Sequence, residues 1–231
     1  MDYSIIITAS HINSHPSIHH IKNTINSLHF LNLKPNTQIL VAHDYSSNSN
    51  FKKYLLNLAF YLIHNKLNNI RITVRPDFGH LTGNIRHAMK YINTKYVLIM
   101  QHDLPFTRHV DINKVVYDMY HYPELKHVRF NKRDNTKFRF DAYNDLFGKQ
   151  KKCNNYVYTR TPGWSDQNHI CLKTYYTKFI LRICKDGDFM EKTMHKRIKN
   201  KKDHIKYGTY IFGHVESKRT IKHSDGRERN Y

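Results

Sequence analysis

Short apolar runs alternate with amphipathic stretches through the first half of the chain. The runs are rich in β-branched residues and predict strands over residues 5–8, 38–42, 70–74 and 96–100. Between the runs, apolar residues recur every three or four positions, as they do on one face of a helix. Strands that alternate with helices predict an α/β domain built on a mostly parallel, doubly wound sheet.

The pattern changes after Pro105. The second half predicts further helices over residues 112–120, 175–184 and 189–198, an alternating aromatic and basic stretch over 128–140, a polar connector over 149–155, and a short strand with a polar tail from Tyr207. We expect these segments to form a smaller mixed region packed beside the sheet. Because the sequence shows no repeat and no linker, it predicts one domain over residues 1–231, with a first half at 1–110 and a second at 111–231.

Carboxylates follow two of the predicted strands. The apolar run over residues 96–100 stops at Gln101-His102-Asp103, and the run over 38–42 is followed by His43-Asp44. Open α/β sheets bind ligands at the carboxyl edge of their strands, so we expect Asp44 and Asp103 to share a site. The alternative is that each is a helix cap or a turn residue.

The segment from Gly79 to Asp103 joins a glycine-containing loop, an arginine-bearing helix at Gly83-Asn84-Ile85-Arg86-His87-Ala88, and a buried strand with an acidic end. This order resembles the nucleotide-sugar domain of GT-A glycosyltransferases, especially family 2. Ile5-Ile6-Ile7-Thr8 is similar to the first strand of that family. The resemblance covers about the first 110 residues, and it implies a GT-A, Rossmann-like fold.

The resemblance also implies roles for residues of the first half. Val41-Ala42-His43-Asp44-Tyr45-Ser46 stands where the family has Val-Asp-Asp-Gly-Ser, with Tyr45 in place of the glycine. Thr8 and Asp44 would then contact the nucleoside. Arg86 would contact the diphosphate.

Gln101-His102-Asp103 stands where the family has its Asp-x-Asp motif. The resemblance implies that Asp103 holds Mg²⁺ or Mn²⁺ together with substrate phosphates, while Gln101 and His102 line the nucleotide-sugar site. Near the end of the chain, His223 would be a second metal ligand, which favours Mn²⁺, and Arg227 would contact the diphosphate. The alternative for these last two residues is a disordered basic tail.

The segment at residues 162–169, Pro-Gly-Trp-Ser-Asp-Gln-Asn-His, resembles the acceptor-side loop of several GT-A enzymes. Trp164 would offer its ring to the apolar face of a sugar, or alternatively anchor the core. Glu191 opens a predicted helix in the way that the family's late acidic motif does, so it is our first candidate for the catalytic base, with Asp166 second. The alternative for Glu191 is compensation of the helix dipole.

Basic residues outnumber acidic ones, with 38 Lys and Arg against 18 Asp and Glu and a formal net charge of +20. Such a field attracts anions, although a low-GC coding bias produces the same composition. The basic run at residues 196–202 is most simply a solvated helix end, and the alternatives are a contact with an anionic phospholipid surface or with nucleic acid.

The three cysteines form no Cys-x-x-Cys pair, which argues against a disulfide framework and against a zinc knuckle. No apolar run approaches the roughly 18 residues of a membrane span. We therefore expect a soluble, cytoplasmic protein.

The sequence as a whole predicts a metal-dependent, inverting glycosyltransferase. It would move a sugar from a UDP- or GDP-sugar to a hydroxyl of a glycan, a lipid-linked acceptor or a protein, with no nucleic-acid partner. One alternative is a basic nucleic-acid-binding protein, whose 17 tyrosines would stack on bases. The other is a catalytically inactive protein of the same fold, because Gln101 replaces an acid.

Overall fold

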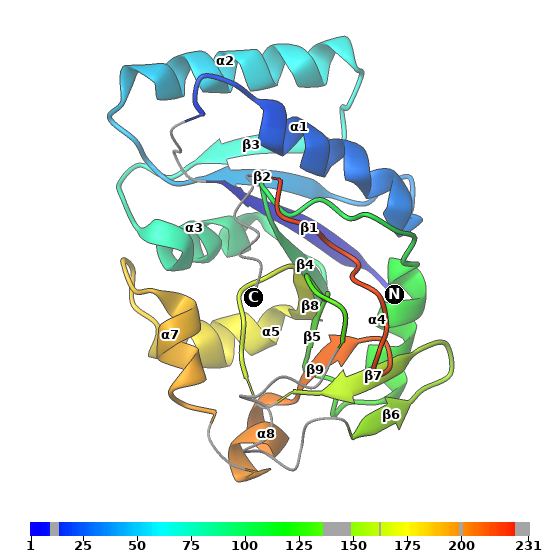
Figure 1. Ribbon diagram of the computed structural model, residues 1–231. Coiled ribbons are helices and arrows are strands. Elements are labelled where there is room, and N and C mark those ends of the chain that lie inside the picture. Colours follow the sequence, from blue (N-terminus) through cyan, green and yellow to red (C-terminus); the bar gives the residue numbers. More distant parts are fainter. Residues whose placement is uncertain (10–13, 136–148, 162, 199–200, 225–231) are drawn as a thin grey trace.

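The first half of the chain forms a parallel sheet, as the sequence predicts. The computed structural model describes residues 1–9, 14–135, 149–161, 163–198 and 201–224 (Figure 1). The parallel strands are β1 (Tyr3–Ala9), β2 (Ile39–His43), β3 (Ile70–Val74) and β4 (Tyr96–Gln101). Each coincides with one of the predicted apolar runs, so this part of the fold prediction is confirmed.

Both faces of this sheet are covered, and every residue of β1 is buried. Ile5 and Ile7 face one apolar cluster and Ile6 faces the other, because successive side chains of a strand point to opposite faces. The first cluster includes residues of α1 (His19–Asn26), α2 (Ser49–His64) and α4 (Ile112–His121), and the second includes residues of α3 (His80–Ala88). Short 3₁₀ turns, Ser27–Leu31 and Met89–Tyr91, follow α1 and α3.

The second half extends the same sheet, whereas the sequence predicts a region packed beside it. The additional strands are β5 (His127–Arg129), β6 (Gln150–Lys152), β7 (Val157–Arg160), β8 (His169–Leu172) and β9 (Thr209–Phe212). Their order continues from β4 as β8-β5-β9-β7-β6, and β8 pairs antiparallel with β4. These strands are three or four residues long. Apart from β9, which corresponds to the short strand predicted from Tyr207, they are too short for a pattern of alternation to reveal them.

The helices that follow β8 contribute side chains to the apolar cluster on the α3 side of the sheet (Figure 1). They are α5 (Lys173–Tyr175), a π-helical turn (Tyr176–Ile180), α6 (Leu181–Ile183), α7 (Met190–His195) and α8 (Lys201–Tyr207). Across the described parts of the chain, no helix combines the length and the apolar character needed to cross a membrane.

The strand order fixes where a site can form. From β1 the chain adds β2 and then β3 on one side, and afterwards it returns to place β4 on the other side of β1. At such a switch point the connections leave the carboxyl edge in opposite directions, and a crevice opens between them. The carboxyl ends of β1, β2 and β4 therefore define the candidate site.

A buried carboxylate joins the second-half strands to α4. Asp118 is fully buried, and its Oδ1 accepts hydrogen bonds from the backbone and side-chain amides of Asn155 at 3.1 and 2.9 Å. Its Oδ2 accepts from the Tyr156 backbone and the Tyr158 hydroxyl, both at 3.0 Å. One side chain thus satisfies three donors of the turn between β6 and β7 and one of β7 itself.

We expect Asp118→Ala to lower the free energy of unfolding by about 3 kcal/mol, since it leaves the buried Tyr158 hydroxyl and three part-buried amides without an acceptor. Urea unfolding followed by circular dichroism measures the change. Lys114→Ala, at an exposed position of the same helix, is the matched control and should change stability by less than about 0.5 kcal/mol. Equal effects of the two substitutions would contradict this account of Asp118.

Candidate active site

Three of the predicted site residues lie side by side at the carboxyl edge of the sheet. Thr8 is in register with Gln101 of β4 and with Ala42 of β2, and Asp44 comes directly after β2. The Thr8 hydroxyl donates a hydrogen bond to the Met100 carbonyl at 3.1 Å. That bond gives Thr8 a structural role, and its contact with a nucleoside stays a prediction.

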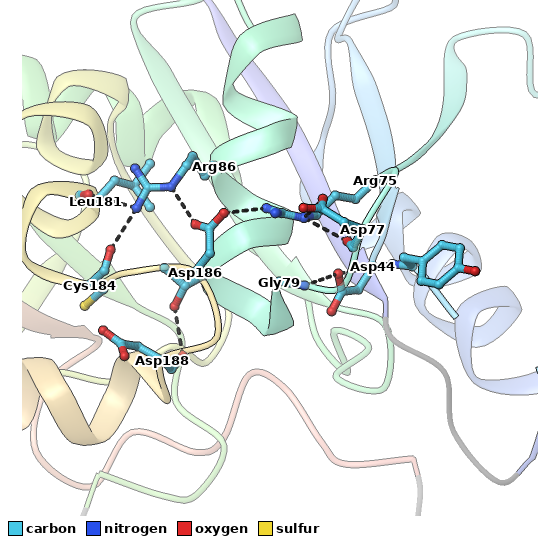
Figure 2. A network of polar contacts seen from close by, with 11 residues as sticks. Asp44, Arg75, Asp77, Gly79, Arg86, Leu181, Cys184, Asp186 and Asp188 are labelled. Atoms are coloured by element: carbon cyan, nitrogen blue, oxygen red, sulfur yellow. Dashed lines mark hydrogen bonds and ion pairs between the residues drawn. The ribbon is translucent and has the colours of Figure 1, made fainter. Parts of the chain in front are cut away.

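Asp44 has one engaged carboxylate oxygen and one that has no hydrogen-bond partner among the described residues. The side chain is 2% exposed, and its Oδ1 accepts from the Gly79 amide at 2.9 Å and the Tyr45 amide at 3.1 Å (Figure 2). Oδ2 is buried and unpaired. Because leaving a buried acceptor unsatisfied is costly, this oxygen is suited to accept a hydrogen bond from a ligand.

Asp186 binds two arginines and joins the two halves of the chain. Its carboxylate lies 2.8 Å from Arg75 Nη1 and 2.7 Å from Arg86 Nε (Figure 2). Partial burial raises the pKa of Asp186, but the hydrogen bonds and charges of the two arginines outweigh it, so the net shift is downward. The sequence did not point to Asp186, because it lies 111 positions after Arg75 and 100 positions after Arg86.

Arg86 points toward the segment before α7. Its Nη2 donates to the carbonyls of Leu181 and Cys184 at 3.0 and 2.8 Å, in addition to the ion pair with Asp186. These contacts give Arg86 a structural role between α3 and the second half, and its contact with a diphosphate stays a prediction.

Two further bonds hold the same segment against the start of α3. The Gly187 amide donates to the Gly79 carbonyl at 2.9 Å, and the Thr82 hydroxyl donates to the Asp188 carbonyl at 3.0 Å. Since α7 begins at Met190, these contacts fix the position of Glu191 relative to the site.

Gln101 contacts Asp166, the second candidate base. Its side-chain amide donates to the backbone carbonyl of Asp166 at 3.1 Å and to Oδ1 at 3.3 Å. Burial, and then the negative charge of Glu191, raise the pKa of Asp166 from 3.8 to about 7. A carboxylate at position 101 would add a further negative charge there, whereas the glutamine amide donates a hydrogen bond. A glutamine therefore suits position 101, next to Asp166, better than the first acid of an Asp-x-Asp motif would.

Asp103 and His223 come together, although 119 residues lie between them in the chain. Asp103 Oδ2 lies 3.5 Å from His223 Nδ1, and His223 Nε2 lies 3.0 Å from Lys132 Nζ. Burial and the charge of Arg133 lower the pKa of Lys132, while the charges of Glu191, Asp103 and Asp166 act in the opposite direction. Sequence reasoning did not identify Lys132, which follows a short strand without any motif.

The pair Asp103 and His223 fits a metal ion as part of a ligand set. A carboxylate oxygen and an imidazole nitrogen that face each other are both suitable for Mn²⁺. Within the described ranges, no group of three or more histidine, cysteine or acidic side chains could hold an ion. An ion here would therefore depend on oxygen ligands from the substrate.

His102 comes directly after β4 and lies close to the buried imidazole of His43. Its imidazole charge acts on buried His43, whose pKa is lowered to about 3 by burial, then by His102 and His15. Its backbone carbonyl accepts from the Thr24 hydroxyl of α1 at 2.7 Å. A nucleotide contact of His102 stays a prediction.

The proposed sugar platform at Trp164 is wrong. The indole is 1% exposed and packs in the cluster on the α3 side of the sheet, with ring contacts to His127 and His169 at 5.4 and 6.1 Å. A sugar cannot reach a ring face that is covered in this way, so Trp164 is a core residue. Arg227 lies outside the described residues.

Comparisons by sequence find no matching family model and no matching curated protein. Solved structures do match. TarS of S. aureus has 13% sequence identity and a TM-score of 0.60, over 96% of this chain and 36% of that chain. The structure of TarS 1–349 in complex with UDP-GlcNAc has 12% identity and a TM-score of 0.59, over 96% of this chain and 58% of that chain.

A third neighbour is the mannosyltransferase PcManGT from Pyrobaculum calidifontis, in complex with GDP-Man and Mn²⁺. It has 10% identity and a TM-score of 0.52, over 76% of this chain and 46% of that chain. The chain thus spans between about a third and three fifths of the length of these neighbours. At such identities the likeness concerns the fold, and the fold is the glycosyltransferase fold that the sequence predicts.

Proposed function

We propose that this protein is a glycosyltransferase that moves a sugar from a UDP- or GDP-sugar to a hydroxyl group of a glycan, a lipid-linked acceptor or a protein, with inversion at the anomeric carbon. The observation that carries the proposal is the placement of polar groups at the carboxyl edge of this sheet: Asp44 follows β2, Asp103 follows β4 and pairs with His223, and Asp166 is hydrogen-bonded to Gln101 of β4. The neighbours solved with UDP-GlcNAc and with GDP-Man support a nucleotide-sugar donor.

The donor nucleoside would bind at the carboxyl ends of β1 and β2. The unpaired Oδ2 of Asp44 is free to accept a hydrogen bond from a ligand, and the imino N–H of uracil or guanine and the ribose hydroxyls are donors of the required kind. The Gly79 amide holds the other carboxylate oxygen in place. This arrangement selects a ligand that donates to Asp44.

The diphosphate would lie toward Asp103, His223 and Lys132. Asp103 and His223 would hold the divalent ion, which when bound offsets the charge that develops on the leaving diphosphate. Lys132, 3.0 Å from His223, adds a positive charge of the protein itself to the same place.

Glu191 is the proposed base and Asp166 its partner. The negative charge of Glu191 is a cause of the raised pKa of Asp166, so the two carboxylates lie close enough to interact. Glu191 would accept the proton of the acceptor hydroxyl as that oxygen attacks the sugar. Asp166, with a pKa of about 7, takes this role if Glu191 does not.

Calorimetry with Mn²⁺ and UDP or GDP tests the assignment of Asp103. We expect Asp103→Ala to weaken metal-dependent nucleotide binding at least tenfold, because an ion ligand is lost. Asp2→Ala removes an exposed acid that pairs with Lys34 and serves as the control. Unchanged metal-dependent binding in Asp103→Ala rejects the metal assignment. Tight, salt-sensitive binding of oligonucleotides without nucleotide-sugar binding would instead favour the nucleic-acid alternative.

Glu191→Gln should lower kcat by about 10² to 10⁴ and leave donor binding intact, since it removes a general base. It should also lower the pKa of Asp166, because one cause of the upward shift is removed. Steady-state kinetics and carboxyl NMR titration measure the two effects. Glu216→Gln, at an exposed position, is the control. Full activity of Glu191→Gln together with inactive Asp166→Asn would assign the base to Asp166.

The raised pKa of Asp166 predicts a dependence of stability on pH. Its folded-state pKa of about 7 exceeds its ordinary value of 3.8, so between these values the native state binds more protons than the unfolded state. The contribution of Asp166 to the free energy of unfolding therefore falls as the pH rises through this window. Urea unfolding at several pH values should show that the free energy of unfolding falls less with rising pH in Asp166→Asn than in the wild type. If the free energy of unfolding changed equally with pH in both proteins, the raised pKa of Asp166 would be contradicted.

A further inference from the structure

Helix α2 is apolar on two sides. Phe51, Tyr54, Leu58 and Leu62 face the core and are buried. On the opposite side Leu56, Phe60 and Ile63 are 59%, 68% and 72% exposed. The spacing of these three residues places them on one face of the helix. Helix α2 is the outermost element on its side of the sheet, at the top of Figure 1, so no described element covers this face.

Lysines surround the exposed apolar face. Lys52 and Lys53 lie one turn before Leu56 and are exposed, and exposed Lys66 follows the end of the helix. Lys22 of α1 also borders the face, with its Nζ 5.5 Å from the centre of the Tyr61 ring. Together with Leu56, Phe60 and Ile63, these four lysines form what we call the α2 surface.

The sequence around the α2 surface contains almost no acid. Between Asp2 and Asp77 the chain has a single acidic residue, Asp44, and its side chain is buried. Helices α1 and α2 therefore carry three lysines and no acidic residue.

A groove lies beside the apolar residues. It has a volume of about 740 Å³ and is lined by Lys22, Asn26, Asn57, Phe60, Tyr61, Ile63, His64 and Asn65. The groove therefore combines aromatic and aliphatic side chains with polar ones and with one lysine.

We propose that the α2 surface binds an anionic phospholipid bilayer, with Leu56, Phe60 and Ile63 inserted at the level of the headgroups and the lysines on lipid phosphates. A helix with exposed apolar residues flanked by lysines is suited to this interface. If a second copy of the chain packed its own α2 surface against this one, lysines would face lysines and repel one another. A nucleic acid would pair the lysines but leave the apolar side chains in water. This surface is separate from the basic run at residues 196–202, and the inference does not depend on the proposed activity.

Flotation with vesicles tests the proposal. The wild type should bind vesicles of phosphatidylcholine with phosphatidylserine, bind vesicles of phosphatidylcholine alone far less, and lose binding as salt is added. The triple variant Leu56→Gln/Phe60→Gln/Ile63→Gln should lower partitioning at least tenfold, since it removes the inserted groups. Lys52→Gln/Lys53→Gln should lower it by about fivefold for each lysine.

Two control variants separate this surface from the overall charge. Ile205→Gln replaces an apolar residue that is 61% exposed on α8, and Lys149→Gln/Lys152→Gln removes two exposed lysines near β6. Both should bind vesicles as the wild type does. Circular dichroism confirms that every variant is folded, as expected for changes at exposed positions.

Tryptophan fluorescence tests directly whether position 60 enters the bilayer. Phe60→Trp should show a blue shift of its emission on anionic vesicles, while Trp164 is buried and should not respond. The proposal would be overturned if the triple variant bound vesicles as tightly as the wild type, or if the control variants lost as much binding as the triple variant. It would also be overturned if the wild type showed no preference for anionic vesicles. A dimer that the triple variant abolishes, without vesicle binding by the wild type, would overturn it in favour of a second copy.

Discussion

The parallel pairing of β1 with both β2 and β4 is the constraint on which the rest of the structure depends. Every residue of β1 is buried, and the strand lies in register between its two neighbours. Because the chain leaves β1 toward β2 and returns to it as β4, the ends of the three strands meet at one edge. The position of the candidate site follows from this pairing.

The ion pairs of Asp186 complete that site from the other half of the chain. Arg75 follows β3 and Arg86 belongs to α3, so a carboxylate held by both fixes the segment before α7 against the first half. Glu191 then lies close enough to Asp166 to raise its pKa. Gln101 of the first half contacts Asp166, so residues of both halves lie at the candidate site, although the sequence shows no motif that links them.

The elements that the sequence predicted correctly are those whose pattern is long enough to be recognised. The first four strands and the helix from Ser49 to His64 coincide with clear apolar patterns. The short strands β6, β7 and β8 were missed because their partners, and not their own residues, determine their conformation, whereas the short strand predicted from Tyr207 corresponds to β9. Trp164 shows the same limit, since a lone indole in a loop is compatible with a binding site and with the core, and only packing distinguished them.

The sequence by itself determined the α/β class, the parallel half of the sheet and the strand ends that carry Asp44 and Asp103, because apolar periodicity is a local property. The tertiary structure decided which side chains meet. It brought His223 and Lys132 to Asp103, gave Arg86 a structural partner in Asp186, and placed the apolar residues of α2 on an outer face. These outcomes depend on contacts between residues far apart in the chain, and no local pattern encodes them.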